Sequence, residues 1–333
     1  MIKRTLYFGN PAYLSTVNEQ LVVEFPMPKG ADEITKPKPS TAPIEDIGVL
    51  ILDNQQITIT QALMAKLLAN NTALITCDYT HHPTGLFLNL DGHTLQSRIF
   101  QAQLEASEPL KKQLWQQTVA AKIQNQAAML GLQSATGSLF NAPDKLLTNY
   151  AKEVKSGDSE NLEAAAAGYY WKHLFQSIVP GFPGSDGEMR SFTRDREGIP
   201  PNNLLNYGYA ILRAVVARGL VGSGLLPTMG IHHRNQYNAY CLADDIMEPY
   251  RPYVDKVVCD IVRTADMAQN DGALKGNYLE LTTDIKKLLL GIPAMDVMID
   301  DKSSPLMNAV QRTTASLAKC FEGKVRKILY PVL

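Results

Sequence analysis

The spacing of apolar residues changes near residue 95, and this change constrains the fold more than any other feature of the chain. Before it, short apolar and β-branched runs such as TLYFG, IGVLILD and ALITCD are separated by Gly, Pro, Asn and Asp, a pattern typical of β-strands. After it, apolar residues recur at helical spacing. We therefore predict an α+β chain, with a β-rich, sandwich-like domain at 1–95 and a larger all-α domain at 96–333.

Several helices can be placed individually. In the β-rich part, TQALMAKLLANN predicts one short helix that Thr60 can cap. In the second part, SEPLKKQLWQQTVAAKIQNQAAMLGL predicts a long helix that starts after Ser107. Further helices are expected at 159–178, 202–218, 237–249, 253–270, 278–289 and 306–321. We interpret Gly219 as the residue that ends the helix at 202–218.

Charge and composition exclude some classes of protein. Apolar residues make up 45% of the chain and charged residues 20%, which favours a packed globular protein. The net charge of −1 argues against a protein that coats nucleic acid through charge alone. We see no run of eighteen or more apolar residues and no signal peptide, and the four cysteines lie far apart, so we expect a cytoplasmic protein with reduced thiols and no membrane span.

The segment GIHHRNQYNAYCLADDIMEPYRP, residues 230–252, combines histidines with carboxylates. Asp245 and Glu248 are three residues apart, and Asp244 and Glu248 are four apart, so their side chains are neighbours on a helix. Like charges so placed repel one another. A divalent cation would remove this repulsion, but so would Arg234, Arg251 or exposure to solvent, and the spacing alone leaves these alternatives open.

A second acidic position, Glu163, lies in SENLEAAAAGYYWKHLF, where four alanines would let another helix approach closely. The alternative is a glutamate placed at a helix N-terminus by the helix dipole. Two carboxylates and an imidazole would suit Mg²⁺ or Mn²⁺. Zinc fits less well, because no cysteine pair or HExxH motif is present.

Basic residues that would contact DNA phosphates are harder to select. Many lysines and arginines are ordinary solvated surface, and the Gly- and Pro-rich stretch 180–201 can be a solvated loop as well as a phosphate-contacting one. The candidates are Lys111, Lys112, Lys122, Arg190, Arg194, Arg196, Arg234 and Arg251.

The stretch GLLPTMGIHHRNQYNAYCLADDIMEPYRPYVD, residues 224–255, resembles the signature of the Cas1 family, the CRISPR-associated integrases that capture new spacers, and in particular its type II branch. The segments RTLYFGNPAYLS, ALITCDYTHHPTGLFLNL, NLEAAAAGYYWKHLF and NNLLNYGYAILRAVVARGL also match in order, so the resemblance covers nearly the whole chain.

This resemblance implies a metal site for Mg²⁺ or Mn²⁺ made by Glu163, His233 and Glu248, with Asp245 as a further carboxylate. It leaves open whether Asp245 or Glu248 is the direct ligand, and whether His232 replaces His233. The implied reaction is attack by the 3′-hydroxyl of a captured DNA fragment on a phosphodiester of the CRISPR repeat.

The resemblance also implies partners. They are DNA, a second copy of the chain in a homodimer, and a dimer of the small Cas2 protein that bridges two such homodimers into a heterohexamer. Two other functions remain open at this point: a stand-alone metal-dependent nuclease on branched or single-stranded DNA, and a non-catalytic structural adaptor whose carboxylates form salt bridges.

Overall fold

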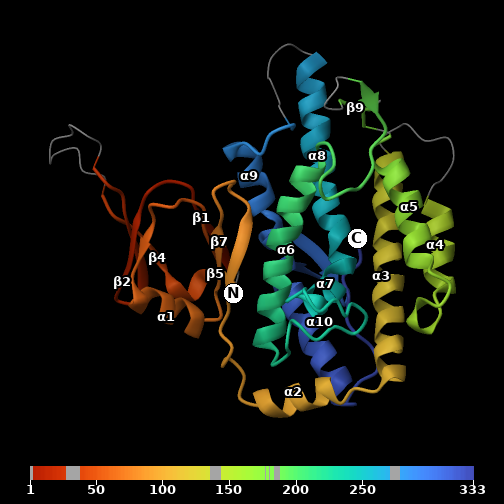
Figure 1. The fold of residues 1–333 in the computed structure, drawn as a ribbon, viewed down its shortest axis with the longest axis horizontal. Coiled ribbons are helices and arrows are strands. Elements are labelled where there is room, and N and C mark those ends of the chain that lie inside the picture. The colour runs from red at the N-terminus through yellow and green to blue at the C-terminus, as the bar shows by residue number, and fades with distance from the viewer. Residues whose placement is uncertain are drawn as a thin grey trace.

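Two four-stranded sheets form the β-rich part of the protein (Figure 1). The computed structural model describes residues 3–27, 38–135, 144–176, 178–179, 181–183, 188–270 and 278–333. The first sheet has the order β1 (Arg4–Phe8), β5 (Ile47–Leu52), β7 (Ala73–Cys77) and β8 (Pro83–Phe87), and its first three strands are parallel. The second has the order β4 (Ser40–Pro43), β3 (Gln20–Glu24), β2 (Tyr13–Val17) and β6 (Thr58–Ile59).

Strand β5 of the first sheet is buried on both faces, which explains its uninterrupted apolar run. Leu50 packs with residues of the second sheet and of helix α1 (Gln61–Ala69). Its neighbours Val49 and Ile51 point the other way and join the core of the helical part. Thr60 caps α1 as predicted, because its hydroxyl accepts a hydrogen bond from the backbone N–H of Leu63.

Helices dominate the rest of the chain. Their bounds are α2 (Gln96–Leu104), α3 (Glu108–Ala135), α4 (Asp144–Glu153), α5 (Leu162–Leu174), α6 (Asn202–Gly222), α7 (Cys241–Met247), α8 (Arg251–Asn270), α9 (Thr283–Leu290) and α10 (Leu306–Phe321). In Figure 1, α3 stands upright, with α4 and α5 on one side and α6 and α8 on the other. The α+β class is therefore confirmed.

Three details differ from the sequence predictions. The second part is not entirely helical, because it contains the short ribbons β9 (Phe182–Pro183) with β10 (Met189–Arg190) and β11 (Asp296–Ile299) with β12 (Lys302–Pro305). Helix α4 was not predicted. Gly219 does not end α6, which continues to Gly222.

The two parts of the chain share one apolar core. Helix α2 begins at Gln96, directly after the predicted boundary, but β5 and β7 contribute side chains to the same cluster as the helices. The boundary at 95 thus marks a change of secondary structure, and the independence of the two domains stays a prediction.

Within the described ranges, α6 is long and apolar enough to cross a membrane. However, 83% of its most apolar window is buried inside the protein, as in the core helix of a globular fold.

Candidate metal centre

Helix α3 brings an aromatic and a cationic side chain to the same region. Trp115 and Lys122 are seven residues apart and therefore lie on one face of the helix. Both are buried, with 3% and 7% of their surfaces exposed. This face of α3 packs against α5 and the single 3₁₀ turn Glu248–Tyr250 that joins α7 to α8.

Glu163 stands in the first turn of α5, at a helix start that Asp158 fixes. The Asp158 carboxylate accepts hydrogen bonds from the backbone N–H groups of Leu162, at 2.9 Å, and of Glu163, at 3.0 Å. Asp158 therefore satisfies two of the free N–H groups of the first turn. The Glu163 side chain remains partly accessible, with 31% of its surface exposed.

Glu248 meets Glu163 at the ammonium group of Lys122. Lys122 Nζ donates a hydrogen bond to Glu163 Oε1 and lies 2.6 Å from Glu248 Oε2. On the other side of the carboxylate, Arg251 is 3.0 Å from Glu248 Oε1. Two carboxylates that are far apart in the sequence therefore share one buried cation.

The ion pairs of Lys122 and Glu248 determine in which direction their pKa values shift. Burial by itself would lower the pKa of Lys122, but Glu248 and Glu163 outweigh it and raise that pKa above its ordinary value. Burial would likewise raise the pKa of Glu248, yet Arg251 and Lys122 hold it below its ordinary value. The carboxylate of Glu248 is thus ionised at neutral pH.

Asp245 binds the backbone of the loop that precedes α7, whereas Glu248 pairs with cations. It is fully buried, and its two oxygens accept hydrogen bonds from the backbone N–H groups of Ile231, His232 and His233 at 2.7, 3.0 and 3.2 Å. Asp245 Oδ1 also lies 2.6 Å from His233 Nδ1. With its oxygens occupied in this way, Asp245 holds the histidine loop, and Glu248 is the carboxylate that faces Glu163.

The two histidines are held differently. The His232 ring stacks on Trp115, with ring centroids 4.1 Å apart and planes within 3°. The His233 ring has Nδ1 engaged by Asp245 and 45% of its side chain exposed. The hydrogen bond with Asp245 raises the pKa of His233, whereas burial lowers that of His232. Asp245 therefore fixes the orientation of the His233 ring and leaves Nε2 as the ring nitrogen that this carboxylate does not engage.

Three of the predicted phosphate contacts are engaged with other side chains of the protein. Lys122 pairs with both carboxylates, and Arg251 pairs with Glu248. Arg194 donates hydrogen bonds to the side-chain oxygens of Asn202 and Asn206. Their contact with DNA stays a prediction, and in this structure their charged groups bind side chains of the protein.

The remaining candidates lie nearer the surface. Arg234 pairs with Glu108 at 2.5 Å, and Lys111 is 3.9 Å from the same carboxylate. Lys112, Arg190 and Arg196 are exposed. For these five residues, contact with DNA phosphates also stays a prediction.

The role of Lys122 was missed, although the sequence holds a signal for it. Lys122 lies between Val119 and Ile123, which are fully buried on the same helix. A lysine inside an apolar stripe has to be paired, because an isolated buried charge is costly. The stripe therefore indicated a buried carboxylate partner.

The donor set fits a hard cation in part. Among the described residues, no three His, Cys, Asp or Glu side chains lie close enough to hold one metal ion. The two carboxylates nevertheless hold a cation between them. Glu248 Oε2 is buried and accepts no hydrogen bond, although it lies close to the ammonium. Two carboxylates and a histidine nitrogen are the oxygen and nitrogen donors that suit Mg²⁺ or Mn²⁺.

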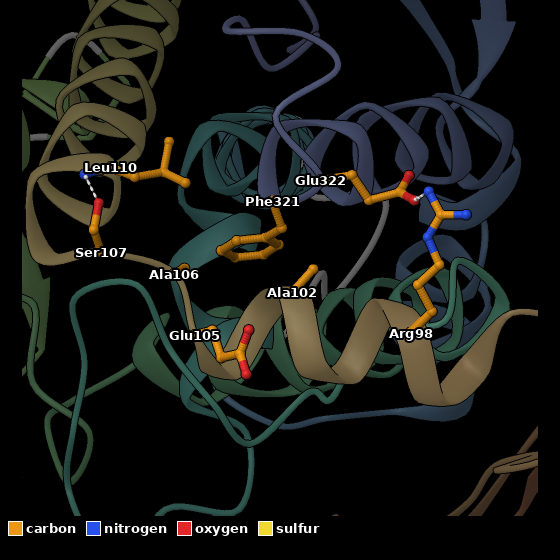
Figure 2. Close-up of a pocket in the computed structure, with 8 residues that line it drawn as sticks. All are labelled: Arg98, Ala102, Glu105, Ala106, Ser107, Leu110, Phe321 and Glu322. Atoms are coloured by element: carbon orange, nitrogen blue, oxygen red, sulfur yellow. Dashed lines mark hydrogen bonds and ion pairs between the residues drawn. The ribbon is translucent and has the colours of Figure 1, made fainter.

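A hollow of about 480 Å³ lies elsewhere, between α2, the start of α3 and the end of α10. Figure 2 shows Phe321 inside it, with the 2.7 Å ion pair of Arg98 and Glu322 at its rim. Its lining does not include Lys122, Glu163, Glu248 or Arg251. We therefore place the candidate site at the paired carboxylates, where the chemistry is, and not at this hollow.

Comparisons with known proteins agree with the sequence resemblance. The family model described as CRISPR associated protein Cas1 matches residues 6–292. The CRISPR-associated endonuclease Cas1 of Neisseria meningitidis serogroup C (strain 8013) is 36% identical over 316 residues, which are 95% of this chain and 91% of that protein.

Solved structures show the same fold. A casposase bound to integration product has a TM-score of 0.74 and 21% identity, with 98% of this chain and 92% of that chain covered. A Cas6-RT-Cas1–Cas2 complex has a TM-score of 0.66 and 19% identity, with 98% of this chain and 35% of the other covered.

Proposed function

The chain belongs to the Cas1 family of CRISPR-associated proteins, and from this premise we propose that it is a metal-dependent DNA endonuclease and integrase of CRISPR adaptation. The observation that carries the proposal is the convergence of Glu163 and Glu248 on one buried cation, beside a histidine whose Nδ1 is held by Asp245. The name of the Neisseria relative supports endonuclease activity, and the likeness to a casposase bound to integration product supports strand joining.

In this proposal Glu163, Glu248 and His233 would hold Mg²⁺ or Mn²⁺. The bound ion would supply a Lewis acid that stabilises charge on the reacting phosphate. Asp245 keeps the histidine loop in place and holds the imidazole of His233 through Nδ1. The 3′-hydroxyl of the captured fragment attacks a phosphodiester of the repeat, so that one P–O bond forms, another breaks, and the repeat strand leaves with a 3′-hydroxyl.

The proposed partners are DNA, a second copy of the chain and Cas2. The fold likeness to a chain of a Cas6-RT-Cas1–Cas2 complex supports the last of these. We propose a homodimer and, with a Cas2 dimer, a heterohexamer. Light scattering after size-exclusion chromatography tests both, and a monomeric mass with and without Cas2 would contradict this part of the proposal.

The central experiment offers a DNA fragment with a 3′-hydroxyl and a supercoiled plasmid that carries a CRISPR repeat, together with Mg²⁺ or Mn²⁺. We expect strand joining, and no joining with a 3′-dideoxy fragment. Hydrolysis without joining would favour a stand-alone nuclease.

One observation favours a structural adaptor instead, namely that both carboxylates are ion-paired in this structure. Glu163→Gln and His233→Ala discriminate between the two functions. For the proposed function, both variants lose strand joining by about a hundredfold or more while circular dichroism shows an intact fold. Full activity in both variants would favour the adaptor.

A further inference from the structure

The ammonium group of Lys122 stands at the point where the two carboxylates meet. We propose that Lys122 is an internal counter-ion, which holds Glu163 and Glu248 together in the metal-free protein and has to leave them before a divalent cation binds there. This inference rests on the proposed function, because it concerns the same carboxylates.

The geometry shows a site closed at its base and open at its rim. Lys122 and Glu248 have only 8% and 6% of their side chains exposed, whereas Glu163 and His233 have 31% and 45%. Access is therefore from the side of Glu163 and His233. A cation that enters there meets the carboxylates with the ammonium already between them.

The contacts of Glu248 show that this arrangement is incomplete. Its Oε2 atom lies 2.6 Å from Lys122 Nζ but accepts no hydrogen bond, while Lys122 donates its hydrogen bond to Glu163. Buried oxygens are almost always hydrogen-bonded or bound to a cation. The pair is thus held by charge, with one buried oxygen left open to a better-placed ligand.

The charge count argues in the same direction. Glu163 and Glu248 carry two negative charges, and Lys122 and Arg251 carry two positive charges, so the cluster is neutral. A divalent ion added to this buried cluster would leave it with two uncompensated positive charges, which is unfavourable. Neutrality would require the flexible lysine stem to carry its ammonium out, or phosphate groups of DNA to enter with the ion. Metal binding in the absence of DNA is therefore weak.

The test is a Mn²⁺ titration of the full chain without DNA, followed by calorimetry and by the electron paramagnetic resonance signal of free Mn²⁺. Lys122→Met removes the competing charge, and we expect at least about tenfold tighter Mn²⁺ binding. Lys122→Gln, which keeps hydrogen-bond donors, gives the same comparison and serves if the methionine variant does not fold. Lys112→Met, an exposed lysine on the same helix, is the matched control and should bind like the wild type.

Thermal unfolding supplies a second readout. Without metal, Lys122→Met should have a lower Tm than the wild type, because two carboxylates lose their shared cation. Mn²⁺ should then raise its Tm by more than it raises that of the wild type. Lys112→Met should show neither effect.

Glu163→Gln separates this inference from the proposed function. If it weakens Mn²⁺ binding but Lys122→Met and Lys122→Gln bind Mn²⁺ no more tightly than the wild type, the counter-ion role is wrong and the metal site stands. Weaker binding in both Lys122 variants would equally overturn it, since Lys122 would then organise the ligands. If neither wild type nor variants bind Mn²⁺, or if Glu163→Gln has no effect, the metal site and the inference fail together.

Discussion

Asp245 shows how one buried side chain can set the state of another. It faces three backbone N–H groups and the Nδ1 atom of His233, and nothing smaller or less charged offers as many acceptors in that space. Replacement by asparagine removes acceptors and turns an amide group toward donors. The histidine loop therefore depends on this carboxylate for both its backbone path and the orientation of its imidazole.

We expect Asp245→Asn to lower the free energy of unfolding by about 2–4 kcal/mol, because several charge-assisted hydrogen bonds are lost in the interior. It should also lower the pKa of His233, which the hydrogen bond with Asp245 raises in the wild type. Histidine NMR signals followed against pH measure this pKa. Asp244→Asn is the control, since Asp244 pairs with Arg213 at 2.6 Å, and it should move the pKa of His233 far less. An equal shift in both variants would contradict the assignment.

The buried carboxyl group of Asp255 should make the stability of the protein depend on pH. Burial raises the pKa of this carboxyl to about 6, although it accepts hydrogen bonds from the hydroxyls of Tyr209 and Tyr170. The native state therefore keeps its proton between about pH 4 and 6, where the unfolded state has lost it, so stability falls as pH rises through this window. Asp255→Asn should remove about 2–3 kcal/mol of that fall, measured by urea unfolding at pH 4 and pH 7. An unchanged difference between the two pH values would refute it.

At the level of residues, the sequence selected candidate side chains for the site but not their arrangement. The spacing and the resemblance selected Glu163, His233, Asp245 and Glu248, and the structure brings Glu163 and Glu248 to one cation. Spacing cannot separate Asp245 from Glu248, because that depends on which way the loop at 230–240 returns. Nor does it reveal that Lys122, on a different helix, fills the space between the carboxylates.

At the level of elements, α6 and α10 cross closely at Gly219. A Cβ atom at this position would lie 3.0 Å from Val310 Cγ1 and 3.3 Å from Thr314. The Thr314 hydroxyl in turn donates a hydrogen bond to the carbonyl of Gly219 at 3.0 Å. This glycine was predicted to end its helix. A glycine near the end of an apolar helix has either role, and only the position of α10 decides between them.

Gly219→Ala should destabilise the protein by about 1–3 kcal/mol, because the added methyl group forces α10 away. The matched control is Gly168→Ala on α5, where a Cβ atom would meet nothing within 4 Å. There the substitution should stabilise by about 0.5–1 kcal/mol, since alanine favours the helix. Chemical denaturation measures both. The same sign for the two substitutions would show that helix propensity, and not the crossing, determines the outcome at Gly219.

The helices were predictable where sequence signals at their ends agreed with apolar spacing. The prediction of 306–321 matches α10, and Thr60 caps α1 as expected. Helix α4 was missed because its sequence, DKLLTNYAKE, has few apolar residues and only Leu147 buried. The ribbon β11–β12 was missed because strands of four residues are too short to show their period.

At the scale of the whole molecule, Asp53 joins the β-rich part to the helical part. It follows β5, is buried, and accepts hydrogen bonds from the Tyr7 hydroxyl at 2.5 Å and from Lys286 Nζ of α9 at 2.8 Å. His81 lies 2.9 Å from it through Nδ1. This joint could not be predicted from the sequence, because Asp53 and Lys286 are separated by 233 residues.

We expect Asp53→Ala to lower the free energy of unfolding by about 3–5 kcal/mol, because it leaves the charge of Lys286 buried without its partner. Lys286→Met should lower the free energy of unfolding by less, since Tyr7 and His81 still contact the carboxylate. The double variant should lose less free energy of unfolding than the sum of the two single variants, which would identify the pair as coupled. Urea unfolding followed by tryptophan fluorescence reports on the helical part, where Trp115 and Trp171 lie, while circular dichroism reports on the whole chain. Because the two parts share one core, we expect both probes to show a single unfolding transition in the wild type. In Asp53→Ala, the two transitions should either separate or both move to a lower urea concentration. A loss below about 1 kcal/mol with unchanged transitions would mean that the apolar core alone, without Asp53, holds the two parts together.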